Sequence, residues 1–167
     1  MNFQTEDDYV HFFNNNSLDS SDSMQTILNK LCFNHENDIL IDYKIFKNIA
    51  SVLTYDMIFK HLENVIRNAS KNNTNDISQK YINIHVSMKS LSLTDVDKHR
   101  NFIINLINYY TGNYPNLLNF GYIYLASSIF KQIYSIFSIF IDKETKKKIH
   151  IIEKHKNKQC EQHDNHE

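Results

Sequence analysis

A run of 25 residues, 117–141, contains a single charged side chain, Lys131, and constrains the fold more than any other part of the sequence. A stretch this long could cross a bilayer as a helix, or it could form the buried central helix of a bundle. A lysine near the middle of a membrane span costs about 2.5–3.5 kcal/mol on insertion scales. Amphipathic segments upstream could wrap the run, so we favour a buried central helix over about residues 117–140. A single-span membrane protein is the alternative.

The composition of the 167-residue chain favours an all-α fold. Two Gly and one Pro are too few for a turn-rich β sandwich or barrel, or for a glycine-rich nucleotide loop. Hydrophobic residues make up 41% and charged residues 22%, which argues against wholesale disorder. The net charge of −1 argues against a dedicated nucleic-acid binder. Cys32 and Cys160 cannot form a disulfide framework, so we expect a reducing compartment.

Apolar residues recur at helical spacing in three segments of the first half of the chain. The spacing predicts helices over residues 24–33, 39–53 and 55–70. The third pattern is the most regular, with apolar side chains at positions i, i+4, i+7 and i+11 from Ile58 to Ala69. These segments supply the amphipathic neighbours that a buried central helix needs.

A further helix is predicted just before the apolar run. Thr94 followed by Asp97 is typical of a helix N-terminus, and Gly112 is a plausible end of the same helix. Residues 81–93 alternate in part between apolar and polar side chains, as a strand would. No second strand is evident to pair with them, so we expect an extended or short helical link there.

The polar ends of the sequence indicate one domain with tails. We expect residues 1–23 to form a partly flexible N-terminal segment, residues 24–156 a single helical domain, and residues 157–167 a polar, disordered tail. Cys160 and His163 have the spacing of metal ligands, but no second pair accompanies them, so we expect no metal site. Catalytic signatures such as G-x-S-x-G and the phosphate loop are missing from the sequence, so we expect no enzymatic activity and no cofactor.

Residues 118–123 read LNFGYI, which resembles the N-W-G-R-I signature that opens the central helix of Bcl-2 family proteins. The upstream segment SLTDVDKHRNFIINLINYYTGN is similar to the fourth helix of that family. The downstream segment IYLASSIFKQI is similar to the fifth helix of the myxoma-type poxvirus members. The resemblance covers about residues 55–140. The chain has 22 Asn, 22 Ile and only three Ala, a composition that agrees with an AT-rich viral genome.

The resemblance implies an inhibitor of host intrinsic apoptosis that sequesters the amphipathic BH-3 helices of Bim, Bak and Bax in a hydrophobic groove. Tyr122 stands where the family has Arg, and Phe120 replaces Trp, so one charged contact to the guest helix is missing. The implied groove residues are Ile58, Leu62, Val65, Ile66, Phe102, Ile103, Leu106, Asn119, Phe120, Gly121, Tyr122, Ile123 and Ala126. The simpler interpretation of the same apolar stripes is that they form the protein core.

The sequence leaves several questions of function, partners and location open. Tyr122 in place of Arg also fits a Bcl-2-fold protein that interferes with innate immune signalling of the NF-kB type. The lysines of residues 143–148 lie beside isoleucines and could touch an anionic membrane, although a solvated helix face is the default. A homodimer with exchanged helices is conceivable, and no nucleic-acid partner is expected. The expected location is the host cytoplasm, with action at the mitochondrial outer membrane and no signal peptide or C-terminal anchor in this chain.

Overall fold

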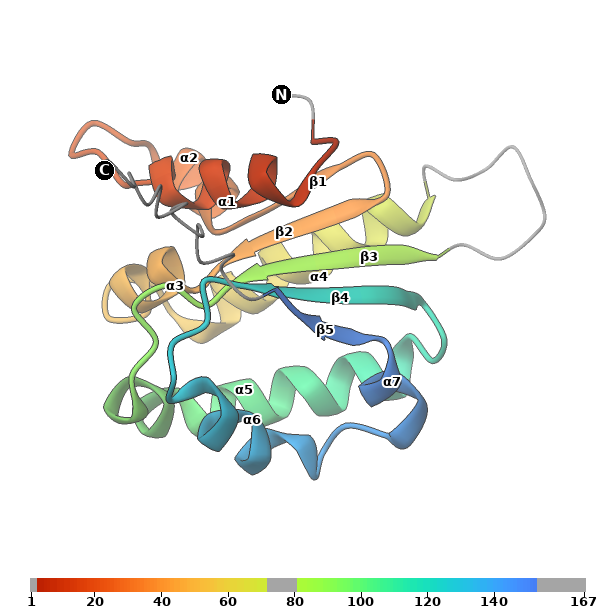
Figure 1. The fold of residues 1–167 in the computed structure, drawn as a ribbon. Coiled ribbons are helices and arrows are strands. Elements are labelled where there is room, and N and C mark those ends of the chain that lie inside the picture. The colour runs from red at the N-terminus through yellow and green to blue at the C-terminus, as the bar shows by residue number, and fades with distance from the viewer. Residues whose placement is uncertain (1–2, 72–80, 153–167) are drawn as a thin grey trace, which may run out of the picture.

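The computed structural model describes residues 3–71 and 81–152. These residues form a five-stranded sheet with helices on both of its faces (Figure 1). The helices are α1 (Glu6–Asn15), α2 (Met24–Leu31), α3 (Tyr43–Ile49), α4 (Tyr55–Lys71), α5 (Leu93–Asn113), α6 (Phe130–Ser138) and α7 (Lys143–Lys147). The strands are β1 (Cys32–His35), β2 (Asp38–Asp42), β3 (Ile82–Ser87), β4 (Leu118–Tyr124) and β5 (Ile149–Ile151). The fold is mixed α/β, and the prediction of an all-α, Bcl-2-like bundle is wrong.

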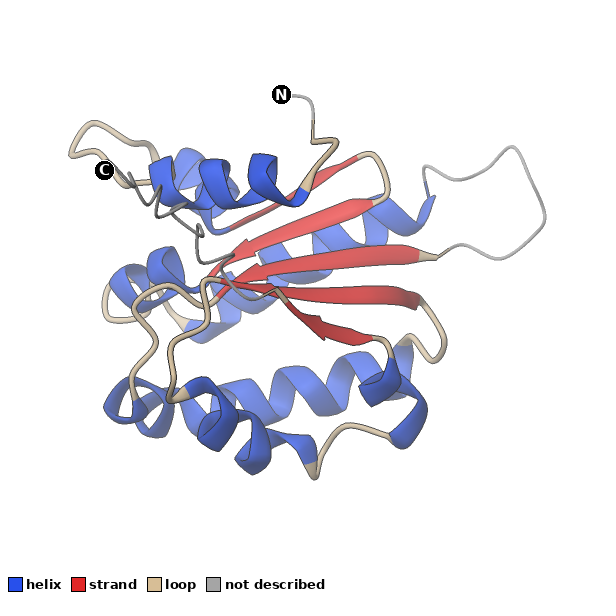
Figure 2. Cartoon of the chain, in the orientation of Figure 1, coloured by secondary structure: helices blue, strands red, loops and turns tan. Residues whose placement is uncertain are grey.

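The strands lie side by side in the order in which they occur in the chain, from β1 to β5. β1 and β2 form an antiparallel hairpin, and each later neighbour pair is parallel. Parallel connections are almost always right-handed, so crossovers that step in one direction place their helices on one face. We call this face, which carries α3, α4, α5 and α6, the helix side (Figure 2). The opposite face carries α1, and we call it the α1 side.

β3 shows how the strands divide their side chains between the two faces. Its apolar residues pack into the core of the helix side, and its polar residues point to the α1 side. The first set is Ile82, Ile84 and Val86, and the second is Asn83, His85 and Ser87. The alternation is visible in the sequence of this segment, which was set aside as a strand because no partner strand was evident.

The run of residues 117–141 is not one helix. It contains β4, then a connection through residues 125–129, then α6. Leu125 adopts a positive φ of 54°, and this left-handed conformation turns the chain away from the strand. The connection between the strand and the helix contains Ser127 and Ser128 but no charged residue, Gly or Pro, which is why the run resembled a single helix. Within the described residues, no helix is both long and apolar enough to span a bilayer, so the single-span alternative has no support.

Of the other helices and links predicted from the sequence, some are confirmed and some are wrong. The helices predicted over 24–33 and 55–70 correspond to α2 and α4. The helix predicted over 39–53 is wrong in its first part, because β2 occupies Asp38–Asp42 and only α3 is helical. The link predicted over 81–93 contains β3, whose partner β4 was hidden in the apolar run. α5 begins two residues earlier than an N-cap at Thr94 would give, because the N-cap is Ser92, which accepts a hydrogen bond from the backbone N–H of Asp95 at 3.2 Å.

The proposed domain division stays a prediction. The structure adds α1 within the first 23 residues, where a capping box between Thr5 and Asp8 starts the helix. Cys160, His163 and the predicted tail lie outside the described residues.

Candidate functional site

The helix side holds the larger of the two hydrophobic clusters, and we call its side chains the helix-side layer. The strands, α4, α5 and α6 all contribute fully or nearly fully buried side chains to it. Principal members are Ile39, Ile82 and Ile123 from the sheet, Ile58, Leu62 and Ile66 from α4, Phe102 from α5, and Phe130, Ile133 and Phe137 from α6. The layer is therefore a continuous apolar region between the sheet and its helices.

The helices differ in how closely they approach the sheet. The backbone of α4 lies close against β1 and β2, whereas α5 and α6 approach the strands less closely and reach them through large side chains. Figure 1 shows α5 and α6 below β4 and β5, next to each other. The part of the helix-side layer under β4 and β5 is thus the part where helices could move apart from the sheet with the least loss of backbone packing.

α6 is a short helix with a clear division between its faces. Phe130, Ile133 and Phe137 are buried, whereas Lys131 and Gln132 are exposed. Its N-cap is Ile129, and no side chain caps the first turn. α6 is therefore a nine-residue helix that covers part of the apolar layer with one face and presents the other face to solvent.

The α1 side is built differently, around the carboxylate of Asp38. The hydroxyl of Tyr9 and the amide of Asn83 both donate hydrogen bonds to Asp38, the second at 2.9 Å. The Nε2 atom of His85 lies 3.6 Å from the same carboxylate, and its Nδ1 lies 2.9 Å from the hydroxyl of Tyr124. Burial acts to raise the pKa of Asp38, but the surrounding polar groups of His85, Tyr9 and Asn83 outweigh it and lower the pKa to about 2.

Stacked rings accompany this polar network. The ring of Tyr9 stacks on that of His85 with centroids 4.0 Å apart. The ring of Tyr122 also stacks on His85, with centroids 4.8 Å apart. Phe13 of α1 is fully buried beside Tyr124. The α1 side therefore holds its helix through both hydrogen bonds and aromatic contacts.

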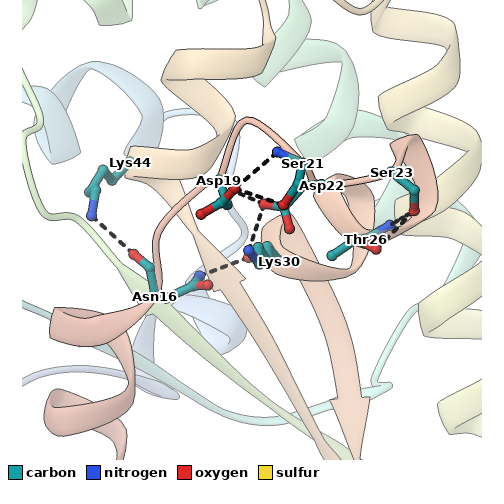
Figure 3. A network of polar contacts seen from close by, with 8 residues as sticks. All are labelled: Asn16, Asp19, Ser21, Asp22, Ser23, Thr26, Lys30 and Lys44. Carbon is teal, nitrogen blue, oxygen red and sulfur yellow. Dashed lines mark hydrogen bonds and ion pairs between the residues drawn. The ribbon is translucent and has the colours of Figure 1, made fainter.

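The connection from α1 to α2 is held by a polar network (Figure 3). Asn16 donates to the backbone carbonyl of Lys30 and to the carboxylate of Asp42, both at 2.9 Å. Lys44 donates to the carbonyl of Asn16 at 3.0 Å, and Lys30 forms an ion pair with Asp22 at 2.6 Å. Burial raises the pKa of Asp42, although hydrogen bonds from the Asn16 amide and from the backbone N–H of Lys44 stabilise its charged form. The network fixes α1 relative to β2, so its role is structural.

The structure does not bring the thirteen predicted groove residues into one groove. Nine of them belong to the helix-side layer or pack against it: Ile58, Leu62, Val65, Ile66, Phe102, Ile103, Leu106, Ile123 and Ala126. Tyr122 packs on the α1 side, and Phe120 is 40% exposed. Asn119 donates to Asn83 at 3.0 Å. A Cβ added at Gly121 would meet Ile149 at 3.6 Å, an ordinary packing distance, so this position does not open onto a guest path.

Sequence reasoning missed several residues that the structure brings together. Asp38 and His85 lie on β2 and β3, neither of which was predicted, and Tyr9 lies in a segment expected to be partly flexible. No motif in the sequence points to Tyr43 or Tyr110, yet each has a buried hydroxyl. An alternating pattern with a polar residue at every second position, as in Ile82–Ser87, was the available signal for the α1 side.

The sequence profile of the CRAL/TRIO domain family matches residues 6–167. This chain belongs to the CRAL/TRIO domain family. A crystal structure of Sfh5 has a similar fold, with a TM-score of 0.64 and 18% sequence identity. The match covers 86% of this chain and 56% of the Sfh5 chain, so the CRAL/TRIO chain described here spans little more than half the length of that protein. No curated protein matches in sequence.

Membership of the CRAL/TRIO family corrects the interpretation based on LNFGYI. The residues that resembled a Bcl-2 signature form β4, and the segment that resembled a fifth helix contains the end of that strand, a connection and the start of α6. The assignments as a poxvirus Bcl-2 homologue, as an apoptosis inhibitor and as a partner of Bim, Bak or Bax are therefore wrong. The alternative role in NF-kB type signalling rested on the same resemblance and has no support.

Proposed function

We propose that this chain binds a lipophilic ligand in the helix-side layer, under β4 and β5, and passes it between membranes or proteins. Membership of the CRAL/TRIO family, whose domains bind lipids and other small lipophiles, supports a ligand of this class. The position of the proposed binding site rests on one observation: α5 and α6 lie less close to the strands than α4 does, and they contact the sheet through large apolar side chains. Displacing α6 would open apolar surface without breaking strand pairing.

The proposed role is binding and transfer without a chemical step. The helix-side layer is lined by apolar side chains, and none of the described residues forms a cluster of three metal-ligating side chains. We further propose a cytoplasmic location, with which the free, fully buried thiol of Cys32 is compatible.

The test is lipid uptake from vesicles. The purified chain is incubated with vesicles of mixed phospholipids and neutral lipids, separated by size exclusion, and extracted for mass spectrometry. We expect a stoichiometric lipophile in the protein fraction. Recovery of no lipid above the level carried by an unrelated soluble protein would contradict the proposal.

Two acidic substitutions on the same helix give the matched control. Ile133→Asp places a charge on the buried face of α6, and Lys131→Asp places the same group on its exposed face. We expect Ile133→Asp to abolish uptake and Lys131→Asp to leave it unchanged, because only the first introduces a charge into the apolar layer. Circular dichroism verifies that both variants fold, and equal uptake by the two folded variants would place the ligand elsewhere.

A further inference from the structure

The chain that leaves α6 places an exposed apolar side chain close in sequence to a group of lysines. Ile139, the C-cap of α6, is 74% exposed, whereas Ile133 on the buried face of the same helix is 5% exposed. Just beyond it, α7 carries Lys143, Lys146 and Lys147. We call Ile139 and these three lysines the basic edge. An exposed aliphatic side chain beside cations is the combination that favours the surface of an anionic membrane.

The acidic side chains in this segment are already engaged. Asp142 caps the first turn of α7 with its carboxylate. Glu144 forms an ion pair with Lys147 at 2.8 Å, and such an exposed pair contributes little and is readily exchanged. Within residues 3–71 and 81–152, neither Lys143 nor Lys146 forms an ion pair with an acidic side chain. The basic edge therefore offers at least two uncompensated positive charges to a partner.

Charge is distributed unevenly over the molecule. The first 23 residues contain five acidic side chains and no lysine or arginine, and three of the five lie in the first turn of α1. Figure 1 shows α1 at the upper edge of the molecule and α6 and α7 along the lower edge, with the sheet between them. The net charge is only −1, so an anionic surface acts on the chain mainly through this asymmetry. It attracts the edge with α7 and repels the edge with α1, which selects one orientation.

We propose that the basic edge docks on the headgroup layer of an anionic membrane, with its lysines at the headgroup charges and the side chain of Ile139 inserted between headgroups. This inference rests on the proposed function, because a chain that exchanges a lipophile with a membrane must meet one. α6 leads directly into the basic edge and covers part of the helix-side layer. Docking therefore brings the helix that covers the proposed ligand site to the membrane surface, where its buried face would meet lipid on displacement.

The test of the charges is cosedimentation of the full chain with vesicles. Vesicles of phosphatidylcholine with about 30% phosphatidylserine should bind about tenfold or more tightly than vesicles of pure phosphatidylcholine. The preference should shrink when the salt rises from about 0.1 M to about 0.5 M, because salt screens exposed charges. Removal of two uncompensated charges by Lys143→Gln/Lys146→Gln should weaken binding by about 25-fold, at roughly fivefold per lysine. Lys60→Gln/Arg67→Gln removes the same charge from exposed positions of α4 and should change binding by less than about twofold.

A second pair of variants tests the apolar contact. Ile139→Ser removes the inserted side chain and should weaken binding to the phosphatidylserine vesicles by about tenfold. Val52→Ser is the matched control, because Val52 is 79% exposed in the connection from α3 to α4 and lies outside the basic edge. It should leave binding unchanged. Circular dichroism verifies that each variant folds, which substitution of an exposed side chain should not disturb.

The outcomes separate this inference from the proposed function. Equal binding to the two kinds of vesicle, or equal binding by the two double variants, would overturn the basic edge as the docking surface. Equal binding by Ile139→Ser and Val52→Ser would overturn insertion and leave a surface for any polyanion, such as an acidic protein. Lipid uptake without preference for phosphatidylserine vesicles refutes docking alone. Docking without any lipid uptake refutes the proposed function alone and keeps the membrane as partner.

Discussion

The two faces of the sheet hold their helices by different means. On the α1 side, one helix is fixed by hydrogen bonds to Asp38 and by rings stacked on His85. On the helix side, α5 and α6 are held mainly by apolar contacts, and the Tyr110 hydroxyl is left unpaired. Directional polar contacts specify one arrangement, whereas apolar contacts tolerate a change of partner. The comparison indicates that the α1 side anchors its helix, and the proposed exchange of ligand would take place on the helix side.

The largest expected effect is loss of the aromatic anchor on the α1 side. Phe13 is fully buried, so Phe13→Ala should lower the free energy of unfolding by about 3–5 kcal/mol through lost burial and a cavity. Urea denaturation measures the change. Phe120→Ala is the control, because Phe120 on β4 is 40% exposed and should cost less than about 1.5 kcal/mol. Similar losses in the two variants would show that α1 is not an anchor.

The next effect concerns the charge of Asp38 and is pH-dependent. Asp38→Asn should destabilise the protein by about 2–3 kcal/mol at pH 7, because several groups point at the carboxylate. The folded-state pKa of Asp38, about 2, lies below the usual 3.8, so the ionised carboxylate stabilises the fold above about pH 4. This contribution is lost as the pH falls from about 4 to 2. The unfolding curves of wild type and variant should therefore differ at pH 7 and converge at pH 2. A difference of the same size at both pH values would contradict the assignment.

The smallest effect compares one hydroxyl on each face. Tyr9→Phe removes a hydrogen bond to a carboxylate and should cost about 1–2 kcal/mol, while the ring still stacks on His85. Tyr110→Phe removes an unpaired hydroxyl and should cost nothing in the ligand-free protein. Thermal denaturation of both variants measures the difference. Equal destabilisation by the two substitutions would contradict the proposed difference between the α1 side and the helix side.

The amphipathic helices could be predicted from sequence, and the sheet could not. α2 and α4 have one buried and one exposed face, so the 3.6-residue period is clear in their sequences. β3 does alternate apolar residues with Asn83, His85 and Ser87, but one alternating segment without an evident partner was not enough to predict a sheet. β4 was hidden in an apolar run because no polar residue separates it from the connection to α6. Because β4 was predicted as a helix, β3 had no partner strand, and because β3 was predicted as a link, nothing indicated that β4 was a strand.

The candidate site was only partly accessible to sequence reasoning for a related reason. Nine of the predicted residues do share one layer, since apolar periodicity identifies core-facing positions. Their role as a binding surface stays a prediction, because the same pattern describes any core. The unpaired hydroxyl of Tyr110 depends on distances between α5, α4 and β1, which come from distant parts of the chain. Which tyrosine hydroxyl forms a hydrogen bond therefore cannot be predicted from the neighbouring sequence.

The contacts of α1 bear on the order in which the protein matures. Tyr9 and Phe13 rest on His85 and Tyr124, residues that a ribosome adds long after the helix itself has emerged. α1 can therefore take its final place only after β4 has joined the sheet. A helix and the strands on which it rests are thus separated by more than 70 residues of synthesis, and their contacts complete the fold late.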